Sequence, residues 1–410
     1  MRIGFVTFGC RLNKAEALDM EAQYAADGWE VVPVGSGAKR GGPPPDVIVV
    51  RGCSVTAKAQ RDCETTIAHL RARHPKAEMR VVGCMPSAGS RKPLAADCKG
   101  PTPSVLRLAT DGYRAAGVNT RLSRAYLKVQ DGCSCRCSYC IVPQFRGAPV
   151  SVPFGDVLAR GRAFLAAGFR EIVVAGCNLC LYRDGRRRLP ELVAALAALE
   201  SPGHRIRLGS IEPGICDGAL LDAMERCPNV CRHIHLSVQS GSDRILSLMR
   251  RPYTAERVAA LCDDARRRLG PRLALGADVI AGFPGETDAD HEATEELLRG
   301  RFVHLHAFPY SERPGTDAAA MSPTVPAALR RARAKELERI GAANRDAFAE
   351  VLAGEEVVVC VERDGNGRTD GYLRCILEGT APRSSLAHAT VKKYFPKSGA
   401  LSATIRTINK

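Results

Sequence analysis

The sequence predicts an α/β protein made of an N-terminal parallel-sheet α/β domain, a central incomplete (β/α)6 barrel and a small C-terminal β-barrel. Strand-like runs alternate with helical stretches through most of the 410 residues, as in parallel sheets. Three early runs each end in Gly-Cys. The final segment consists of short β-type runs separated by glycine-rich turns, which is typical of small barrels.

Residues 1–118 form the predicted N-terminal domain. Its strands are expected at 3–10, 47–53 and 80–84, with helices at 14–27 and 57–74. Parallel strands end at one edge of the sheet, where ligands bind. Cys10, Cys53 and Cys84 close the three strands and are therefore expected to converge. The alternative is three unrelated buried cysteines, since cysteine packs well as a small core residue.

Residues 119–324 form the predicted barrel. Six strand–helix units fit an incomplete β/α barrel, in which chemistry sits at the carboxyl ends of the strands. A cysteine-rich loop follows the first strand, where an active site is expected. The strands are expected at 125–130, 171–175, 205–210, 233–238, 273–280 and 302–308, and helices at 154–167, 190–199, 255–269 and 289–298.

Residues 325–350 read as one basic linker helix opened by Pro326. Residues 351–410 form the predicted β-barrel, with strands at 356–362, 372–377, 389–391 and 403–405 and a turn at 364–367. Such barrels bind oligonucleotides, although a β-appendage without a partner is the alternative. Few aromatic residues are available there to stack on bases: Tyr372, Tyr394 and Phe395.

Composition favours an intracellular protein with an acidic partner. The net charge of +15 suits nucleic acid, although an Arg- and Ala-rich composition can also reflect genome bias. The first residues read as a strand rather than a secretory signal, and no apolar run approaches a membrane span. We therefore expect a cytoplasmic protein without membrane association. Its 17 cysteines then serve metal binding, catalysis or burial rather than disulfides.

The most specific motif is Cys-x3-Cys-x2-Cys at Cys133, Cys137 and Cys140. Three thiolates on a short loop hold three corners of a 4Fe-4S cube and leave the fourth iron open for a substrate. A zinc knuckle that includes Cys135 is the alternative. Zinc sites use paired Cys or His ligands, and no His pair follows at the usual distance. The spacing therefore favours the iron–sulfur cluster.

Beyond the cysteine motif, specific sequence stretches lie at 7–13, 53–56, 128–133, 137–143, 146–147, 205–213, 235–243, 282–287 and 310–316. Through these stretches the chain resembles, over nearly its full length, the radical S-adenosylmethionine (SAM) methylthiotransferases. Within that family, the stretch 128–133 is most similar to the branch that acts on N6-threonylcarbamoyladenosine in tRNA.

The resemblance implies two 4Fe-4S clusters and SAM as cofactors. Cys133, Cys137 and Cys140 would hold the cluster that cleaves SAM, and Cys10, Cys53 and Cys84 an auxiliary cluster. The implied reaction adds a methylthio group to carbon 2 of an adenosine next to the anticodon, by a radical step. The implied partners are a tRNA anticodon loop and an electron donor such as flavodoxin or ferredoxin, while the sulfur donor is unspecified.

SAM contacts are expected at the carboxyl ends of the barrel strands. The candidates are Tyr139, Gly176, Ser210, Gln239 and Ile280, each of which has an alternative role as a strand-end turn or packing residue.

The resemblance is incomplete. Arg51 stands where relatives usually carry Asn, which leaves the substrate open. Isopentenyladenosine in tRNA and a ribosomal protein side chain are alternative substrates, and a non-enzymatic zinc RNA-binding module is a third possibility. The pairs Cys177/Cys180 and Cys227/Cys231 are expected to be plain core or surface thiols.

Overall fold

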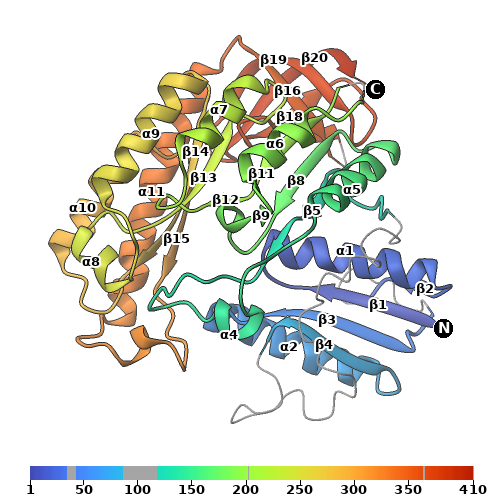
Figure 1. The fold of residues 1–410 in the computed structure, drawn as a ribbon, viewed down its shortest axis with the longest axis horizontal. Coiled ribbons are helices and arrows are strands. Elements are labelled where there is room, and N and C mark those ends of the chain that lie inside the picture. Colours follow the sequence, from blue (N-terminus) through green and yellow to red (C-terminus); the bar gives the residue numbers. More distant parts are fainter. Residues whose placement is uncertain (35–42, 86–117, 202, 363–364, 410) are drawn as a thin grey trace.

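The protein is an α/β structure with three parts along the chain, seen in a computed structural model that describes residues 1–34, 43–85, 118–201, 203–362 and 365–409 (Figure 1). The predicted fold class is confirmed. The predicted end of the N-terminal domain adjoins residues 86–117, which lie outside the described residues. Of the described helices, none is both long and apolar enough to span a lipid bilayer.

The N-terminal part is a four-stranded parallel sheet with strand order β2-β1-β3-β4. Strand β3 is buried at every position, which explains its continuous apolar sequence. The short strand β2 is absent from the sequence prediction. The elements are β1 (Arg2–Thr7), α1 (Arg11–Ala26), β2 (Glu30–Val32), β3 (Val47–Cys53), α2 (Ala57–Arg73) and β4 (Glu78–Cys84).

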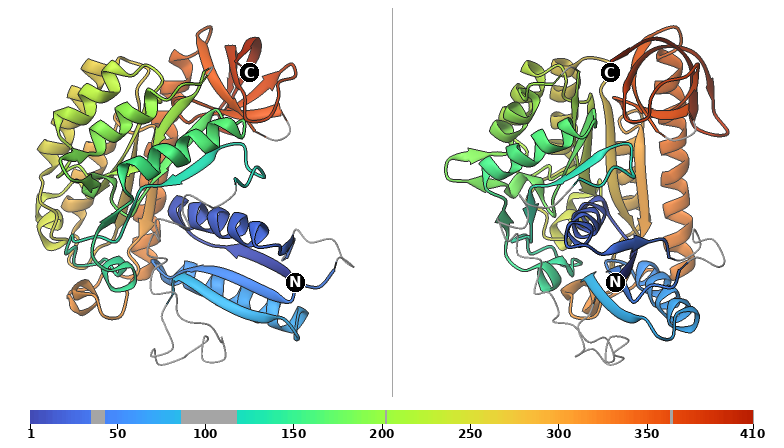
Figure 2. Two further views of the ribbon diagram at one scale, coloured as in Figure 1. Left: turned by 45° about the vertical axis from the view of Figure 1, so that its right-hand side comes forward. Right: turned by 90° about the vertical axis from the view of Figure 1, so that its right-hand side faces the viewer.

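The central part contains the six predicted strand positions, divided between two parallel sheets with orders β11-β8-β5 and β12-β13-β14-β15. The third strand is interrupted at Gly209, where a Cβ atom would lie 2.9 Å from the carbonyl oxygen of Val174. Figure 2 shows the sheets curving with helices on their outer side. The strands are β5 (Ala125–Lys128), β6 (Gln130–Asp131), β7 (Val150–Ser151), β8 (Glu171–Ala175), β9 (Arg183–Asp184), β10 (Arg187–Arg188), β11 (Arg205–Leu208), β12 (Ser210–Ile211), β13 (His233–Gln239), β14 (Ala274–Ala281) and β15 (His304–Pro309).

Four helices of this part lie close to the predicted ranges 154–167, 190–199, 255–269 and 289–298, and three further helices were not predicted. A short helix, α4 (Val142–Arg146), follows the cysteine loop directly. The others are α5 (Phe154–Ala166), α6 (Leu189–Ala197), α7 (Gly218–Arg226), α8 (Asp243–Leu248), α9 (Ala255–Leu269) and α10 (Asp288–Leu298).

The C-terminal part is a closed barrel that follows the long helix α11 (Ala327–Val351). The predicted turn at 364–367 is wrong in part, because a strand begins at Asn366. Antiparallel pairing with the neighbouring strands on both sides, β16 and β18, imposes the extended backbone on these residues. The strands are β16 (Glu356–Val361), β17 (Asn366–Thr369), β18 (Arg374–Glu378), β19 (Leu386–Phe395) and β20 (Ala400–Asn409).

Two buried arginines of the central part hold the C-terminal barrel. Arg205 donates to the carbonyl oxygen of Val358 at 2.7 Å, and Arg207 donates to that of Asp370 at 2.8 Å. Both guanidinium groups also pair with the buried carboxylate of Glu171. A buried ion pair that is this well hydrogen-bonded fixes geometry. The C-terminal barrel is therefore docked firmly on the amino ends of β8 and β11.

Tyr372 completes this interface and corrects one expectation. Its ring lies among the guanidinium groups of Arg11, Arg207 and Arg368, at 4.9 to 5.2 Å, and is 5.3 Å from the ring of His233. It is therefore not available to stack on RNA bases. The other two aromatic candidates differ in their availability to stack on bases. The Tyr394 hydroxyl is held by a hydrogen bond to Asp346 at 2.5 Å, whereas Phe395 is exposed.

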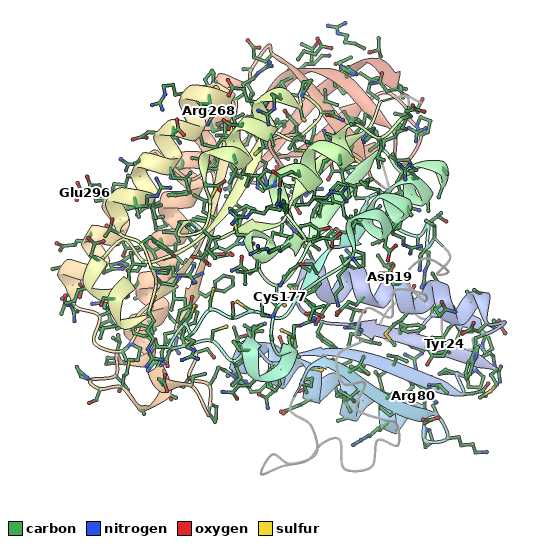
Figure 3. All side chains as sticks on the ribbon, viewed as in Figure 1. Asp19, Tyr24, Arg80, Cys177, Arg268 and Glu296 are labelled. Carbon is green, nitrogen blue, oxygen red and sulfur yellow. The ribbon has the colours of Figure 1, made fainter. Side chains whose placement is uncertain are left out.

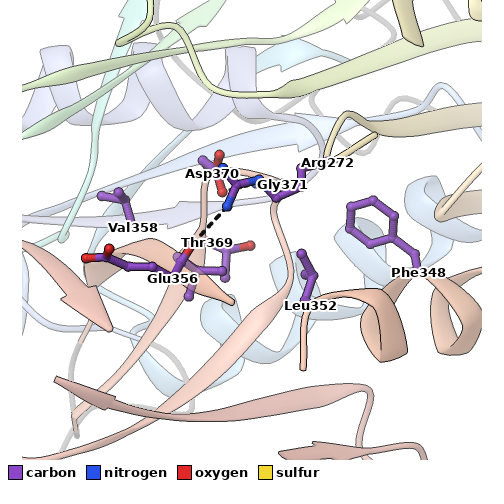
Figure 4. Close-up of a pocket in the computed structure, with 9 residues that line it drawn as sticks. Arg272, Phe348, Leu352, Glu356, Val358, Thr369, Asp370 and Gly371 are labelled. Carbon is purple, nitrogen blue, oxygen red and sulfur yellow. Dashed lines mark hydrogen bonds between the residues drawn. The ribbon is translucent and has the colours of Figure 1, made fainter. Parts of the chain in front are cut away.

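A cavity of about 110 Å³ lies at the same junction, between α11, β16 and the turn after β17 (Figure 4). Phe348 and Leu352 line one side, and Arg272 donates to the carbonyl oxygen of Glu356 at 3.1 Å. No cysteine lines this cavity. It is therefore separate from the site that the sequence motifs indicate.

Candidate functional site

Cys10 meets the strand-end residues Cys53 and Cys84 at one edge of the N-terminal sheet. The strand predicted at 3–10 ends already at Thr7, so that Cys10 caps the start of α1 instead. Cys53 and Cys84 are paired positions of β3 and β4. The chain before Cys10 crosses over Cys53 at Gly9, which has a φ of +89° and whose Cβ atom, if present, would lie 3.1 Å from the Cys53 sulfur. Burial raises the pKa of the Cys84 thiol, and the neighbouring Cys10 and Cys53 thiols raise it further. The structure thus brings together the three thiols, with Cys53 and Cys84 buried and Cys10 exposed.

The second set of thiols lies on the loop after β6. The backbone N–H of Cys140 donates to the carbonyl oxygen of Cys137 at 3.1 Å, which tightens the loop. Arg251 donates to the Cys137 sulfur at 3.2 Å and pairs with Glu212. A contact with the Cys135 thiol lowers the pKa of Cys133 to about 6, whereas burial raises the pKa of Cys140 to about 12.

Arg146 connects the two sets of thiols. Helix α4 places it six residues beyond Cys140, and its Nε donates to the Cys84 sulfur at 3.0 Å. Its Nη1 donates to Asp131 at 2.9 Å, and its Nη2 to Asn13 at 2.6 Å. Sequence reasoning did not assign this role, although the pair Arg146-Gly147 was among the stretches that carry the family resemblance.

A buried carboxylate organises the same junction. Glu16 of α1 pairs with Arg51 of the N-terminal sheet and with Lys128 and Arg146 of the central part. Its pKa lies well below the ordinary value, since the attraction of these three cations outweighs the effect of burial. Arg51, which departs from the family pattern, therefore serves this ion-pair network, with Cys84 among its neighbours.

The loop after β15 contacts α2, the helix that follows Cys53. Ser311 accepts a hydrogen bond from the backbone N–H of Ala57 at 2.9 Å, at the start of α2. Arg313 donates to Gln60 on the same helix at 2.5 Å. The N-terminal domain is thus held against the carboxyl edge of the central sheets from two sides.

Two of the predicted SAM contacts lie in one apolar cluster. Tyr139 and Ile280 pack against a buried core that includes Phe283 and Tyr310, and the Tyr139 and Phe283 rings meet edge to face at 6.4 Å. Ser210 lies exposed on β12. This grouping at the carboxyl ends of the strands suits a flat aromatic ligand.

The remaining two candidates have distinct local roles. Gln239 ends β13 at a register shift with a φ of +66°, and such strained backbone in a residue other than glycine clusters at functional sites. At Gly176, a Cβ atom would lie 3.0 Å from both Gln130 and Leu179. Packing therefore explains the glycine at position 176.

Cys177 lies closer to the site than expected. Its thiol donates to Asp131 at 3.3 Å, and the neighbouring Asn178 contacts the Cys135 sulfur at 3.6 Å. Figure 3 shows Cys177 where the central part faces α1. By contrast, Cys231 is buried away from the loop beside Arg207. Of the cysteines in the described part of the chain, all are free thiols.

Comparison with known proteins finds two family matches along the chain. Residues 127–298 match the family described as "Radical SAM superfamily", and residues 2–98 match "Uncharacterized protein family UPF0004". A tRNA-2-methylthio-N(6)-dimethylallyladenosine synthase of Cereibacter sphaeroides is 32% identical over 88% of this chain and 87% of its own length. The chain belongs to the radical-SAM methylthiotransferase family. A threonylcarbamoyladenosine tRNA methylthiotransferase, MtaB of Rickettsia prowazekii, is 29% identical over 91% of this chain and 90% of its own length.

Solved structures share the fold. The radical S-adenosylmethionine methyltransferase TsrM of Kitasatospora setae, with cobalamin and a [4Fe-4S] cluster bound, superposes with a TM-score of 0.53. The alignment covers 78% of this chain and 77% of that chain at 15% identity. At this identity the likeness concerns the fold alone.

As a radical-SAM methylthiotransferase, the protein is an enzyme whose family membership implies a 4Fe-4S cluster and SAM. The donor set fits such a cluster. The loop cysteines offer three thiolate ligands, and Arg251 beside Cys137 supplies positive charge for an anionic cluster. The strand-end cysteines offer a matching set of three thiols beside Arg146.

Proposed function

We propose that the protein transfers a methylthio group to carbon 2 of a hypermodified adenosine next to the anticodon of tRNA. The observation that supports this proposal most is the hydrogen bond from Arg146 to the Cys84 sulfur, because Arg146 lies on α4, the helix that directly follows the loop of Cys133, Cys137 and Cys140. The tRNA substrate is the one named for the relatives in Rickettsia prowazekii and Cereibacter sphaeroides.

In this proposal Cys133, Cys137 and Cys140 hold the cluster that binds SAM, and the strand-end thiols Cys10, Cys53 and Cys84 hold the auxiliary cluster. When bound, the first cluster and SAM supply a radical that removes hydrogen from an unactivated C–H bond, a step that no acid or base performs. Tyr139, Gly176, Ser210, Gln239 and Ile280 are the proposed SAM contacts.

This chain's own residues position and shield the site. Arg146 and Arg251 hold one thiol of each set by hydrogen bonds. The apolar cluster around Phe283 excludes water from the proposed SAM position, which protects a reactive intermediate from side reactions. Glu16 fixes α1 against the central part, so that the two sets of thiols keep their relative placement.

The exposed basic residues suit an RNA partner. Arg331, Lys335 and Arg339 recur along one exposed stripe of α11. Two other arginines of this helix are used internally: Arg330 pairs with Glu312, and Arg333 with Glu286 and Asp288. The stripe and the +15 net charge provide sequence-independent attraction to phosphates.

We infer that N6-threonylcarbamoyladenosine is the modified base. Arg136 is exposed inside the cysteine loop, between Cys135 and Cys137. A guanidinium group there suits a substrate that carries a carboxylate, which the threonylcarbamoyl group has and a dimethylallyl group lacks. The stretch 128–133 supports the choice of this base less than Arg136 does, because Lys128 is paired with Glu16 and Asp131 is paired with Arg146.

Dimethylallyladenosine is the second candidate, favoured by the names of relatives such as the 34% identical protein of Novosphingobium aromaticivorans. Mass spectrometry of tRNA nucleosides from a strain that lacks the gene separates the two. Loss of 2-methylthio-N6-threonylcarbamoyladenosine alone supports the proposal. Loss of the dimethylallyl nucleoside reassigns the base, and unchanged methylthio nucleosides refute the tRNA function.

A further inference from the structure

Two histidines and one aspartate meet on the inner face of the second core sheet, away from the cysteines. Strands β13, β14 and β15 are parallel neighbours. Asp278 and His306 are paired positions of β14 and β15, and His235 is paired with Gly276. All three side chains sit in mid-strand, below the carboxyl-end loops that carry the thiols.

The direction of these side chains follows from packing. Leu305 faces α11, because a Cβ atom at Gly341 of that helix would lie 2.7 Å from the Leu305 side chain. Successive residues of a strand point to opposite faces, so that His304 and His306 face the barrel interior. Gly276 leaves room for His235 to lean across β14, since a Cβ atom there would lie 2.3 Å from His235 Nδ1.

The donor atoms converge on one point. His235 Nε2 lies 3.0 Å from Asp278 Oδ1, and His306 Nδ1 lies 3.1 Å from the same oxygen. The three donor atoms all lie within 4.8 Å of one another. Ligands that share one ion at about 2.0–2.1 Å are roughly 2.9–3.4 Å apart for octahedral or tetrahedral angles. The two histidine–aspartate separations fall in this range, which ordinary hydrogen bonds share.

A second observation points to a partner that the described protein residues do not supply. His233 is 1% exposed, and neither of its ring nitrogens has a hydrogen-bond partner among the described residues. Its ring stacks at 6.2 Å from that of His235. Buried polar groups are almost always satisfied by protein, water or an ion, so a further component is expected beside His233, next to the ring of His235.

We propose that His235, Asp278 and His306 bind one divalent transition-metal ion, with zinc as the best-suited ion. Two imidazoles and one carboxylate are a common ligand set for zinc. The His306 side chain is 55% exposed, in contrast to 5% for His235. The open coordination positions therefore face the accessible side of the barrel, where water or an anionic oxygen would complete the shell.

Metal analysis of the cluster-loaded enzyme tests this proposal. The protein is reconstituted with iron and sulfide, dialysed against Zn²⁺ and analysed by mass spectrometry for zinc and iron per chain. We expect about one zinc per chain at this site. Asp278→Asn and His306→Gln each weaken zinc binding at least about tenfold, since even indirect changes to a metal site cost that much, while the iron content is unchanged.

His291→Gln is the matched control. His291 Nε2 also lies near two carboxylates, 3.1 Å from Glu336 and 3.4 Å from Glu295, but on the helices α10 and α11. We expect this variant to bind zinc as the unchanged protein does. Equal zinc binding in Asp278→Asn and the unchanged protein, or loss of zinc in His291→Gln, overturns the assignment.

Anomalous diffraction at the zinc edge provides an independent measurement. We expect one peak between His235 Nε2, Asp278 Oδ1 and His306 Nδ1, and its absence in crystals that contain zinc refutes the site. Neither measurement uses tRNA or activity. A negative result here therefore leaves the proposed methylthio transfer untouched, and failure of that transfer leaves the metal site untouched.

Discussion

Arg146 donates a hydrogen bond from its Nε to the Cys84 sulfur at 3.0 Å, although the two residues belong to different parts of the chain. This contact ties the loop of Cys133, Cys137 and Cys140 to the edge of the N-terminal sheet. A thiolate ligand that accepts a charge-assisted hydrogen bond is stabilised in its ionised form. Substitution of Arg146 should therefore weaken cluster binding by Cys10, Cys53 and Cys84 but not by Cys133, Cys137 and Cys140.

Arg146→Gln is expected to lower the occupancy of the auxiliary cluster while the SAM-binding cluster stays. Iron per chain then falls from about eight towards about four, and SAM cleavage persists. Iron analysis and electron paramagnetic resonance of the reduced protein measure both effects. Arg162→Gln, at an exposed position of α5, is the control and keeps the full iron content. Unchanged iron in Arg146→Gln would disprove the supporting role.

Glu16→Gln is expected to destabilise the fold by about 3–5 kcal/mol, because it leaves buried cations without their carboxylate. The pKa of Glu16 is lowered in the folded state. Its contribution to stability is therefore present above the unfolded pKa of about 4.3 and is lost as the pH falls below that value. Denaturant unfolding at several pH values measures this. Glu30→Gln, at an exposed position, should change stability by no more than about 0.5 kcal/mol.

Tyr372 is expected to ionise at lower pH than a free tyrosine. Although burial opposes ionisation, the surrounding guanidinium groups, including those of Arg11 and Arg124, lower its pKa to about 8. Folding stability should therefore rise between pH 8 and the unfolded pKa of about 10. The tyrosinate absorbance of the protein minus that of Tyr372→Phe gives the midpoint. A midpoint near 10 would show that the arginines do not surround the ring.

Cys133 is expected to be the most readily alkylated thiol of its loop in the cluster-free protein near neutral pH. Its pKa is lowered to about 6 by contact with the Cys135 thiol, while that of Cys140 is raised to about 12 by burial. Only the thiolate reacts. Peptide mapping after brief iodoacetamide treatment at several pH values measures the order. Cys135→Ala should shift the reactivity of Cys133 to higher pH, and no shift would contradict the contact.

The sequence was sufficient to predict the meeting of Cys53 and Cys84, because parallel strands that both end in Gly-Cys bring those ends to one edge. It was also sufficient to place the cysteine loop after the first core strand. The Arg146 contact with Cys84 spans 62 residues and depends on how α4 is oriented. No periodicity or spacing encodes that orientation, so the contact was not predictable.

Tyr372 shows a different limit. An aromatic residue in a basic β-rich segment is typical of an RNA-stacking surface, and the pattern alone predicts exposure. Docking of the C-terminal barrel through Arg205 and Arg207 instead leaves this residue half-buried, with its ring against arginine side chains. The histidine cluster was likewise missed, because His235, Asp278 and His306 lie on three separate strands and share a face only once the register is known.

Iron and acid-labile sulfide analysis of three proteins tests the central claim most directly. The proteins are the unchanged chain, the triple variant Cys10→Ala/Cys53→Ala/Cys84→Ala and the triple variant Cys133→Ala/Cys137→Ala/Cys140→Ala, each reconstituted without oxygen. We expect about eight, four and four irons per chain, respectively, with a different cluster spectrum in each variant. A total of four irons in the unchanged chain, or full iron content in either triple variant, would contradict the presence of two separate three-thiol cluster sites.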